Sequence, residues 1–132
     1  MQKDKVLIES KLLSFLLETK NYGEKENKLF HDVSEYIRIN VCFAPKVKDV
    51  ASHFGYNADY LSRLFIKNCG FSLKKYIDRE RESLISDKLL NTTMTLKEIA
   101  AECSFEDDNA LIKFFTARAG CSPTAYRNKI FA

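Results

Sequence analysis

Apolar residues recur with a helical period along nearly the whole chain, and no sustained alternation typical of strands interrupts them. The sequence therefore predicts an all-α fold. A first helix is expected over about residues 4 to 19, and a polar, glycine-containing linker over about residues 20 to 27. A second helix, over about residues 28 to 41, should end before Pro45, because proline cannot continue the hydrogen-bond ladder of a helix.

One segment of the chain recurs fifty residues further on. The stretch "YLSRLFIKNCGFSLKKY", which begins at Tyr60, shares five identities in one ungapped window with "ALIKFFTARAGCSPTAY". The identical pairs are Leu61 and Leu111, Phe65 and Phe115, Gly70 and Gly120, Ser72 and Ser122, and Tyr76 and Tyr126. Such self-similarity indicates that one structural unit occurs twice.

Each copy has the pattern of a short helix, a tight turn and a second helix, which is typical of a helix-turn-helix. The first is expected over about residues 47 to 70 and the second over about residues 96 to 119. Gly55 supplies the first turn, because glycine adopts a left-handed backbone at little cost. Between the copies, residues 73 to 91 carry apolar positions at helical spacing without a breaker, which predicts a rigid connector helix about 27 Å long.

The second helix of each copy presents an outward face of hydrogen-bonding, cationic and small apolar groups. These outward positions are Asp59, Ser62, Arg63 and Ile66 in the first copy, and Asn109, Ile112, Lys113 and Thr116 in the second. Arg63 can grip guanine and Asn109 suits adenine, while Ile112 or the methyl group of Thr116 can contact a thymine methyl. A solvated helix surface is the simpler interpretation of any one of them. The repeat favours DNA, since a connector of this length could hold two such helices in successive major grooves, about 34 Å apart.

Charge and composition permit this function without requiring it. The net charge is +3 and the pI about 8.6, a mildly basic balance. The four cysteines lack paired zinc-site spacing and are interpreted as small buried residues in a reducing compartment, with a redox pair of Cys69 and Cys121 as the alternative. No nucleophile motif, phosphate-binding loop or metal-ligand cluster occurs in the sequence, so we expect neither an enzyme nor a cofactor or metal site. A cytoplasmic protein without a membrane partner is expected, because no long apolar run or signal-peptide core is present.

The motifs "YLSRLF", "KEIAAECSF" and "GCSPTAYR", in this order and spacing, resemble the DNA-binding domain of the AraC/XylS family of bacterial transcription regulators. The resemblance covers about residues 29 to 131. It implies a seven-helix domain over about residues 28 to 132, with two homeodomain-like helix-turn-helix subdomains joined by one long helix. Such a domain binds an asymmetric promoter site and recruits or hinders RNA polymerase.

Carried over residue by residue, the family's base-contacting positions coincide largely with the outward faces. They fall on Asp59, Ser62 and Arg63 in the first copy, and on Asp108, Asn109, Ile112 and Lys113 in the second. Lys67, near the end of the first of these helices, stands where a phosphate contact is expected.

The second copy departs from the family pattern. Ser104 stands where the family usually has the turn glycine, Ala110 where an aromatic residue is frequent, and Lys113 where arginine is usual. Acidic residues also crowd the entrance of its second helix: Glu102, Glu106, Asp107 and Asp108. We interpret Asp107 as a helix cap and expect the other three to weaken phosphate approach, so the first copy should carry most of the sequence-specific binding energy. A metal or a protein partner bound by these acids is the alternative.

Three further expectations concern the rest of the chain. The charged run at residues 79 to 82 is interpreted as a solvated face of the connector, with internal pairing of Arg81, which falls where the family has its arginine, as the alternative. Residues 1 to 27, the predicted N-terminal helix and linker, could support a homodimer, pack against the domain, or lead to a sensor domain in a longer protein. The competing function for the whole chain is a helical protein-interaction module with weakened DNA binding.

Overall fold

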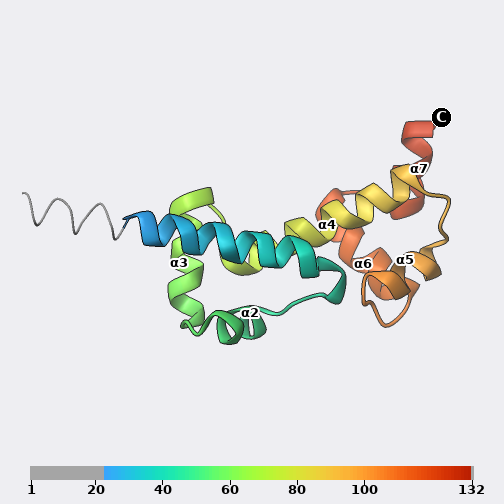
Figure 1. The fold of residues 1–132 in the computed structure, drawn as a ribbon. Coiled ribbons are helices and arrows are strands. Elements are labelled where there is room, and N and C mark those ends of the chain that lie inside the picture. The colour runs from blue at the N-terminus through green and yellow to red at the C-terminus, as the bar shows by residue number, and fades with distance from the viewer. Residues whose placement is uncertain (1–22, 132) are drawn as a thin grey trace, which may run out of the picture.

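The computed structural model describes residues 23–131, so the helix predicted over about residues 4 to 19 lies outside the described part of the chain. The described residues form helices and short connections, with no strand among them (Figure 1). An N-terminal helix covers residues 23–40 and is followed by a short 3-10 helix, η1. The elements in order are η1 (Val41–Phe43), α2 (Val47–Phe54), α3 (Ala58–Cys69), α4 (Leu73–Asn91), α5 (Leu96–Glu102), α6 (Asp108–Ala119) and α7 (Pro123–Phe131). The predicted all-α fold with two helix-turn-helix units and a connector is confirmed.

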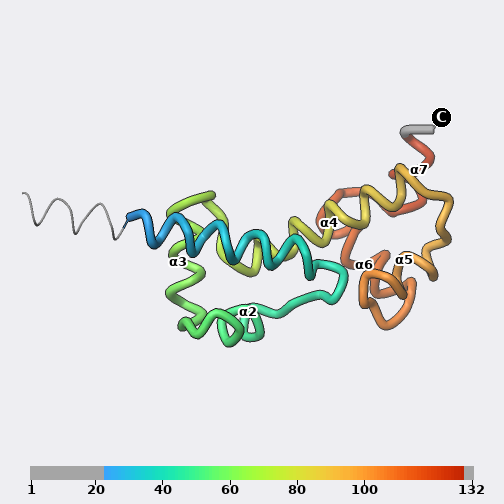
Figure 2. The backbone as a smooth tube through the Cα atoms, viewed as in Figure 1, coloured from blue at the N-terminus to red at the C-terminus, as the bar shows by residue number. Residues whose placement is uncertain are grey.

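The two units are built on the two ends of α4, which runs through the middle of the domain (Figure 2). We call α2 with α3 the first unit and α5 with α6 the second unit. Leu73 and Ile77 of α4 belong to the core of the first unit, whereas Ile85 and Leu89 belong to the core of the second. Each pair is four residues apart and therefore lies on one helix face. As a 19-residue helix, α4 is about 28 Å long and acts as a spacer between the units.

The residues that repeat in the sequence have the same structural roles in both units. Gly70 and Gly120 end α3 and α6 in the left-handed conformation, with φ of 82° and 80°. Ser72 and Ser122 each accept a hydrogen bond from a backbone N–H three residues later, at 3.2 and 3.1 Å, and so cap the next helix. The two tyrosines of the repeat also match: each ring lies against a core phenylalanine, with centroids 5.0 Å apart in the first unit and 5.3 Å in the second. The residues that are identical in the two copies are therefore those that cap the helices and pack the cores.

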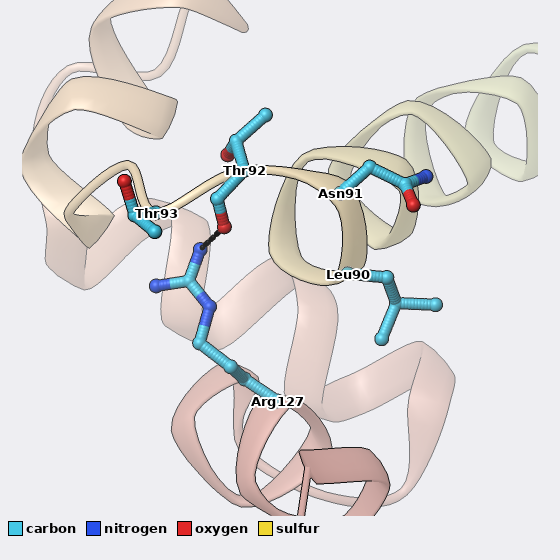
Figure 3. Close-up of a pocket in the computed structure, with 5 residues that line it drawn as sticks. All are labelled: Leu90, Asn91, Thr92, Thr93 and Arg127. Carbon is cyan, nitrogen blue, oxygen red and sulfur yellow. Dashed lines mark hydrogen bonds between the residues drawn. The ribbon is translucent and has the colours of Figure 1, made fainter.

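The carboxyl end of α4 is held by an arginine from α7. Arg127 donates from Nε to the carbonyl of Leu89 at 2.9 Å and from Nη1 to the carbonyl of Met94 at 2.8 Å. Its Nη2 also reaches the carbonyls of Lys88 at 3.4 Å and Thr92 at 3.3 Å, the second of which is drawn in Figure 3. The last carbonyls of a helix lack partners within the helix, so the guanidinium satisfies groups that would otherwise rely on water.

One boundary differs from the sequence prediction. Residues 20 to 27 were expected to form a linker, but residues 23–27 belong to the N-terminal helix, which ends at residue 40. This stretch contains no proline, and a single glycine costs a helix only about 1 kcal/mol. A tertiary contact also supports it, because Glu26 is only 14% exposed and pairs with Lys67 of α3, Oε2 to Nζ at 3.0 Å.

Candidate nucleic-acid interface

The outward face of α3 is accessible. Asp59 and Arg63 are exposed, Ser62 is half-buried, and Ile66 keeps 53% of its surface exposed. The residues that anchor the helix from the opposite side are Leu61, Leu64 and Phe65, none more than 4% exposed. The predicted division between an inner and an outer face is therefore confirmed. The contacts of the outer residues with bases stay predictions.

The first turn of α3 is well defined. The side chain of Asn57 caps it, with Oδ1 accepting the N–H of Asp59 at 2.7 Å. The Nε of Arg63 donates to the carbonyl of Asp59 at 3.4 Å, which directs the exposed guanidinium along the outer face. Two parallel N–H donors of a guanidinium match O6 and N7 of guanine, so this geometry suits a base contact in a major groove.

Lys67 is less free than its position in the sequence suggests. Its side chain is 71% exposed, yet its Nζ lies 3.0 Å from Oε2 of Glu26 on the N-terminal helix. An ammonium group has three donors, and the ion pair occupies one of them. Any phosphate contact by Lys67 therefore competes with, or is added to, a carboxylate already in place.

The outward face of α6 carries the remaining predicted residues. Asn109, Lys113 and Thr116 are exposed, while Asp108 and Ile112 are half-buried. Leu111 and Phe115 are fully buried on the opposite side. The four predicted outward positions thus lie opposite the buried residues of α6, with Asp108 beside them, and their contacts with bases stay predictions.

Phe114 links α6 to the connector rather than simply filling the core. The guanidinium carbons of Arg81 and Arg118 lie 4.7 and 5.5 Å from its ring centroid. Arg118 also pairs with Asp78 of α4 at 3.6 Å and with Glu82 at 3.4 Å. Cations over an aromatic face and partly buried ion pairs both favour one docking of α6 on α4.

These contacts correct one expectation about the connector. Arg81 and Glu82, part of the run interpreted as a solvated face, are half-buried against the second unit, and for Arg81 the contacts agree with the alternative of an internal role. Burial lowers the pKa of Arg81 from its usual value, opposed by the nearby Asp78 carboxylate, and the group still stays protonated at neutral pH. The connector helix that carries Arg81 could be predicted from the sequence, but its contacts with the rings of Phe105 and Phe114 could not.

Two of the four acidic residues near the start of α6 have structural roles. Asp107 caps α6, with Oδ1 accepting the N–H of Ala110 at 2.8 Å, as predicted. Glu102 pairs with Lys88 of α4, and this hydrogen bond is the main reason why the pKa of Lys88 is raised. The charge of Glu102 is therefore compensated within the domain, contrary to the expectation that it opposes phosphates. The exposed Glu106 and the half-buried Asp108 leave that expectation in place.

Two adjoining clefts separate the units and are rich in cations. They share Lys74, Asp78 and Arg81 of α4. One cleft extends to Lys113 and Arg118 of α6, and the other to the start of α2. A recess between the two units in which cations outnumber acids suits the backbone of a duplex.

The described residues contain no group of three or more His, Cys, Asp or Glu side chains able to hold a metal ion. The four cysteines are free thiols, of which Cys103 is buried and the other three are half-buried. None of the helices in residues 23–131 is both long and apolar enough to cross a membrane.

Comparison with known proteins defines the class to which this fold and surface belong. The sequence profile of a family described as "Helix-turn-helix domain" matches residues 50–129, from within α2 to within α7, and so covers most of the first unit, the connector and the second unit. The chain belongs to this family of helix-turn-helix domains. It carries the DNA-binding domain of the AraC/XylS transcription regulators, as the motifs predicted.

Individual relatives agree with this assignment. The chain is 33% identical over 100 residues to the HTH-type transcriptional regulator YfiF of Bacillus subtilis, covering 76% of this chain and 32% of YfiF. It is 28% identical over 109 residues to the HTH-type transcriptional activator AarP of Providencia stuartii, covering 83% of this chain and 81% of AarP. The chain thus spans about a third of the length of YfiF but most of AarP.

A solved structure shares the fold. The DNA-binding domain of the global transcriptional factor AdpA, solved with a target DNA, superposes with a TM-score of 0.68 at 21% sequence identity. The match covers 76% of this chain and 90% of that domain. At this identity the likeness establishes the architecture of two helix-turn-helix units on a connector.

Proposed function

We propose that this domain binds one asymmetric promoter site in duplex DNA as a single chain, with α3 and α6 as reading helices in successive major grooves. The observation that carries the proposal is the pair of accessible outer faces on helices fixed to the two ends of α4. The spacer length of about 28 Å is compatible with grooves about 34 Å apart on one side of the duplex. The family membership favours this function over a protein-interaction module.

Within this proposal the side chains have distinct roles. Arg63 contacts a guanine, and Ser62 and Asp59 select neighbouring bases. In the second groove Asn109 reads adenine, while Ile112 and the Thr116 methyl contact thymine methyls. Residues proposed to act on the backbone or as weaker base contacts are Lys67, Asp108 and Lys113.

The first unit supplies most of the sequence-specific energy. Arg63 offers a bidentate fork that Lys113 cannot offer, because an ammonium group acts as a point charge. Glu106 and Asp108 place negative charge near the entrance of α6, which opposes phosphates there. The second unit is therefore the weaker or more permissive reader.

The wider role is regulation of transcription in the bacterial cytoplasm, by recruiting or hindering RNA polymerase at the bound promoter. The name of AarP, a transcriptional activator, supports the regulatory role. The segment before residue 23 is proposed to mediate a homodimer or an intramolecular contact. Size measurement of the full chain with and without residues 1 to 22 tests this, because a dimer contact predicts a change in mass.

Selection of bound sequences from random duplex DNA tests the DNA-binding proposal. We expect enrichment of one asymmetric site of about two helical turns, bound by a monomer. Binding should weaken steeply as salt rises, since several phosphate contacts release counterions. Palindromic half-sites would overturn the single-chain arrangement, whereas absence of enrichment together with salt-insensitive protein binding would favour the interaction module.

A further inference from the structure

The turn of the second unit is built on an unfavourable backbone. Ser104 has φ of 63°, in the left-handed region that glycine occupies easily and other residues seldom adopt. The first unit uses Gly55 at the corresponding turn, with φ of 72°. Serine at this turn therefore carries a conformational cost that glycine would avoid, and such a cost persists only where the surroundings hold it in place.

The serine side chain makes a contact that glycine could not make. Its Oγ donates a hydrogen bond of 2.6 Å to the carbonyl of Cys42, which is 62 residues earlier in the chain. Cys42 lies in η1, just before the first unit, and η1 packs against α4. The residue before the serine, Cys103, is buried in the core of the second unit. The bond thus joins the turn of the second unit to η1, the segment that leads into the first unit, and so adds an attachment besides the shared helix α4.

A second strained residue lies at the same contact. Ala44 follows Cys42 by two positions and has φ of 51°, and its N–H donates to the carbonyl of Val41 at 3.1 Å to close η1. Within residues 23–131, Ala44 and Ser104 are the two residues other than glycine with positive φ. The hydrogen bond from Ser104 thus ends on a short segment that itself closes with a residue in the left-handed region, and such backbone persists where the surrounding structure holds it in place.

We propose that Ser104 is a positioning residue that locks the second unit against the first and so fixes the spacing and rotation of the two reading helices. The proposal rests on the DNA-binding function proposed above. A single long helix can bend, so α4 alone leaves the units some relative freedom. A second attachment removes that freedom before DNA is bound, which lowers the entropic cost of binding a correctly spaced site and penalises a wrongly spaced one.

Two substitutions of Ser104 distinguish the effect of losing its hydrogen bond to Cys42 from the effect of its unfavourable backbone conformation. Ser104→Ala removes the hydroxyl and keeps a side chain at positive φ, whereas Ser104→Gly removes the hydroxyl and relieves the backbone. We expect the glycine variant to unfold at a higher temperature than the alanine variant. Ser83→Ala, on the exposed side of α4, is the matched control for loss of a serine hydroxyl.

The first readout is independent of DNA. Residual dipolar couplings of backbone amides should fit one alignment tensor for both units in the full wild-type chain and in the control. In both Ser104 variants the two units should need separate tensors. A wild-type chain that needs two tensors, or variants that still fit one, would overturn the lock whatever the DNA results.

The second readout is the spacing preference on the selected site. The penalty for inserting or deleting one base pair between the two half-sites should fall by about three- to tenfold in both variants, the range expected for loss of one hydrogen bond. An unchanged penalty with intact binding would overturn the role in spacing. One shared tensor in a chain that binds no duplex would instead contradict the proposed function and leave the lock in place.

Discussion

The two helix-turn-helix units share a scaffold and differ in how they are attached. In both, the reading helix (α3 or α6) ends at a glycine in the left-handed conformation, and a serine caps the helix that follows. The second unit adds ion pairs from Arg118 to α4, stacking of Arg81 on Phe114, and the hydrogen bond from Ser104 to η1. The first unit has the better base-reading side chain, Arg63, and lacks acidic crowding at its entrance.

This difference indicates that the second unit mainly positions the domain on DNA and the first unit mainly reads the bases. Contacts that hold a unit in place are formed in the free protein, so they reduce the cost of ordering when DNA binds. Contacts that discriminate bases are formed only in the complex. A second unit that is firmly docked but chemically weaker can set the register, while the first unit determines the preferred sequence.

The largest expected effect tests whether the scaffolds are equivalent. Phe65 and Phe115 are both fully buried and occupy the same place in the repeat. Truncation of either to alanine should lower the free energy of unfolding by about 3–5 kcal/mol, through lost burial and a cavity. Urea denaturation followed by circular dichroism measures this. A loss several-fold smaller for one of them would show that the cores are not equivalent.

The next effect concerns the contact between α7 and the carboxyl end of α4, the end that carries the second unit. Arg127→Ala should lower the free energy of unfolding by about 1.5–3 kcal/mol, because carbonyls at the end of α4 lose a charged donor. Arg127→Lys is the matched control, since it keeps the charge but cannot span several carbonyls. Full recovery by lysine would argue that charge alone matters at this position.

Base reading should separate the units clearly. Arg63→Ala is expected to weaken binding to the selected site by about five- to 100-fold, the value of one bidentate base contact. Lys113→Ala should cost less than about fivefold, as for a single point charge near the backbone. Fluorescence anisotropy titrations on the same duplex compare the two variants.

A charge-preserving variant sharpens this comparison. Arg63→Lys should keep the salt dependence of binding and lose discrimination at the guanine position. Equal losses for Arg63→Ala and Lys113→Ala would contradict the proposed asymmetry.

The smallest effect addresses the ion pair of the first unit. Glu26→Gln should raise DNA affinity about two- to threefold at low salt, because Lys67 is then released for phosphate and one negative charge is lost. Glu24→Gln, at an exposed position on the same helix, is the control for the change in net charge. A gain of the same size in both variants would assign the effect to net charge rather than to Lys67.

Local features of the fold followed from the sequence because they depend on neighbouring residues. The spacing of Leu61, Leu64 and Phe65 defines a buried helix face, and the connector contains no residue that breaks a helix. Asp107 could be identified as a cap from its place before a helix. The same reasoning failed at residues 23–27, where polarity alone indicated a linker.

The remaining features of the site depend on the tertiary structure. The partners of Ser104, Lys67 and Arg127 are 62, 41 and 33 to 39 residues away in sequence, so no local pattern marks them. Ser104 was visible only as a departure from the expected glycine. Its positioning role is inferred from the hydrogen bond between its hydroxyl and the carbonyl of Cys42.

Methylation interference on the selected duplex tests the central claim most directly, because methylation of guanine N7 blocks contacts in the major groove. The account predicts two clusters of interfering guanines on one face of the duplex, with centres about 10 to 10.5 base pairs apart, bound by one chain. The cluster assigned to α3 should lose its strongest position in Arg63→Ala. A single cluster, or two clusters on opposite faces, would contradict the placement of α3 and α6 in successive major grooves.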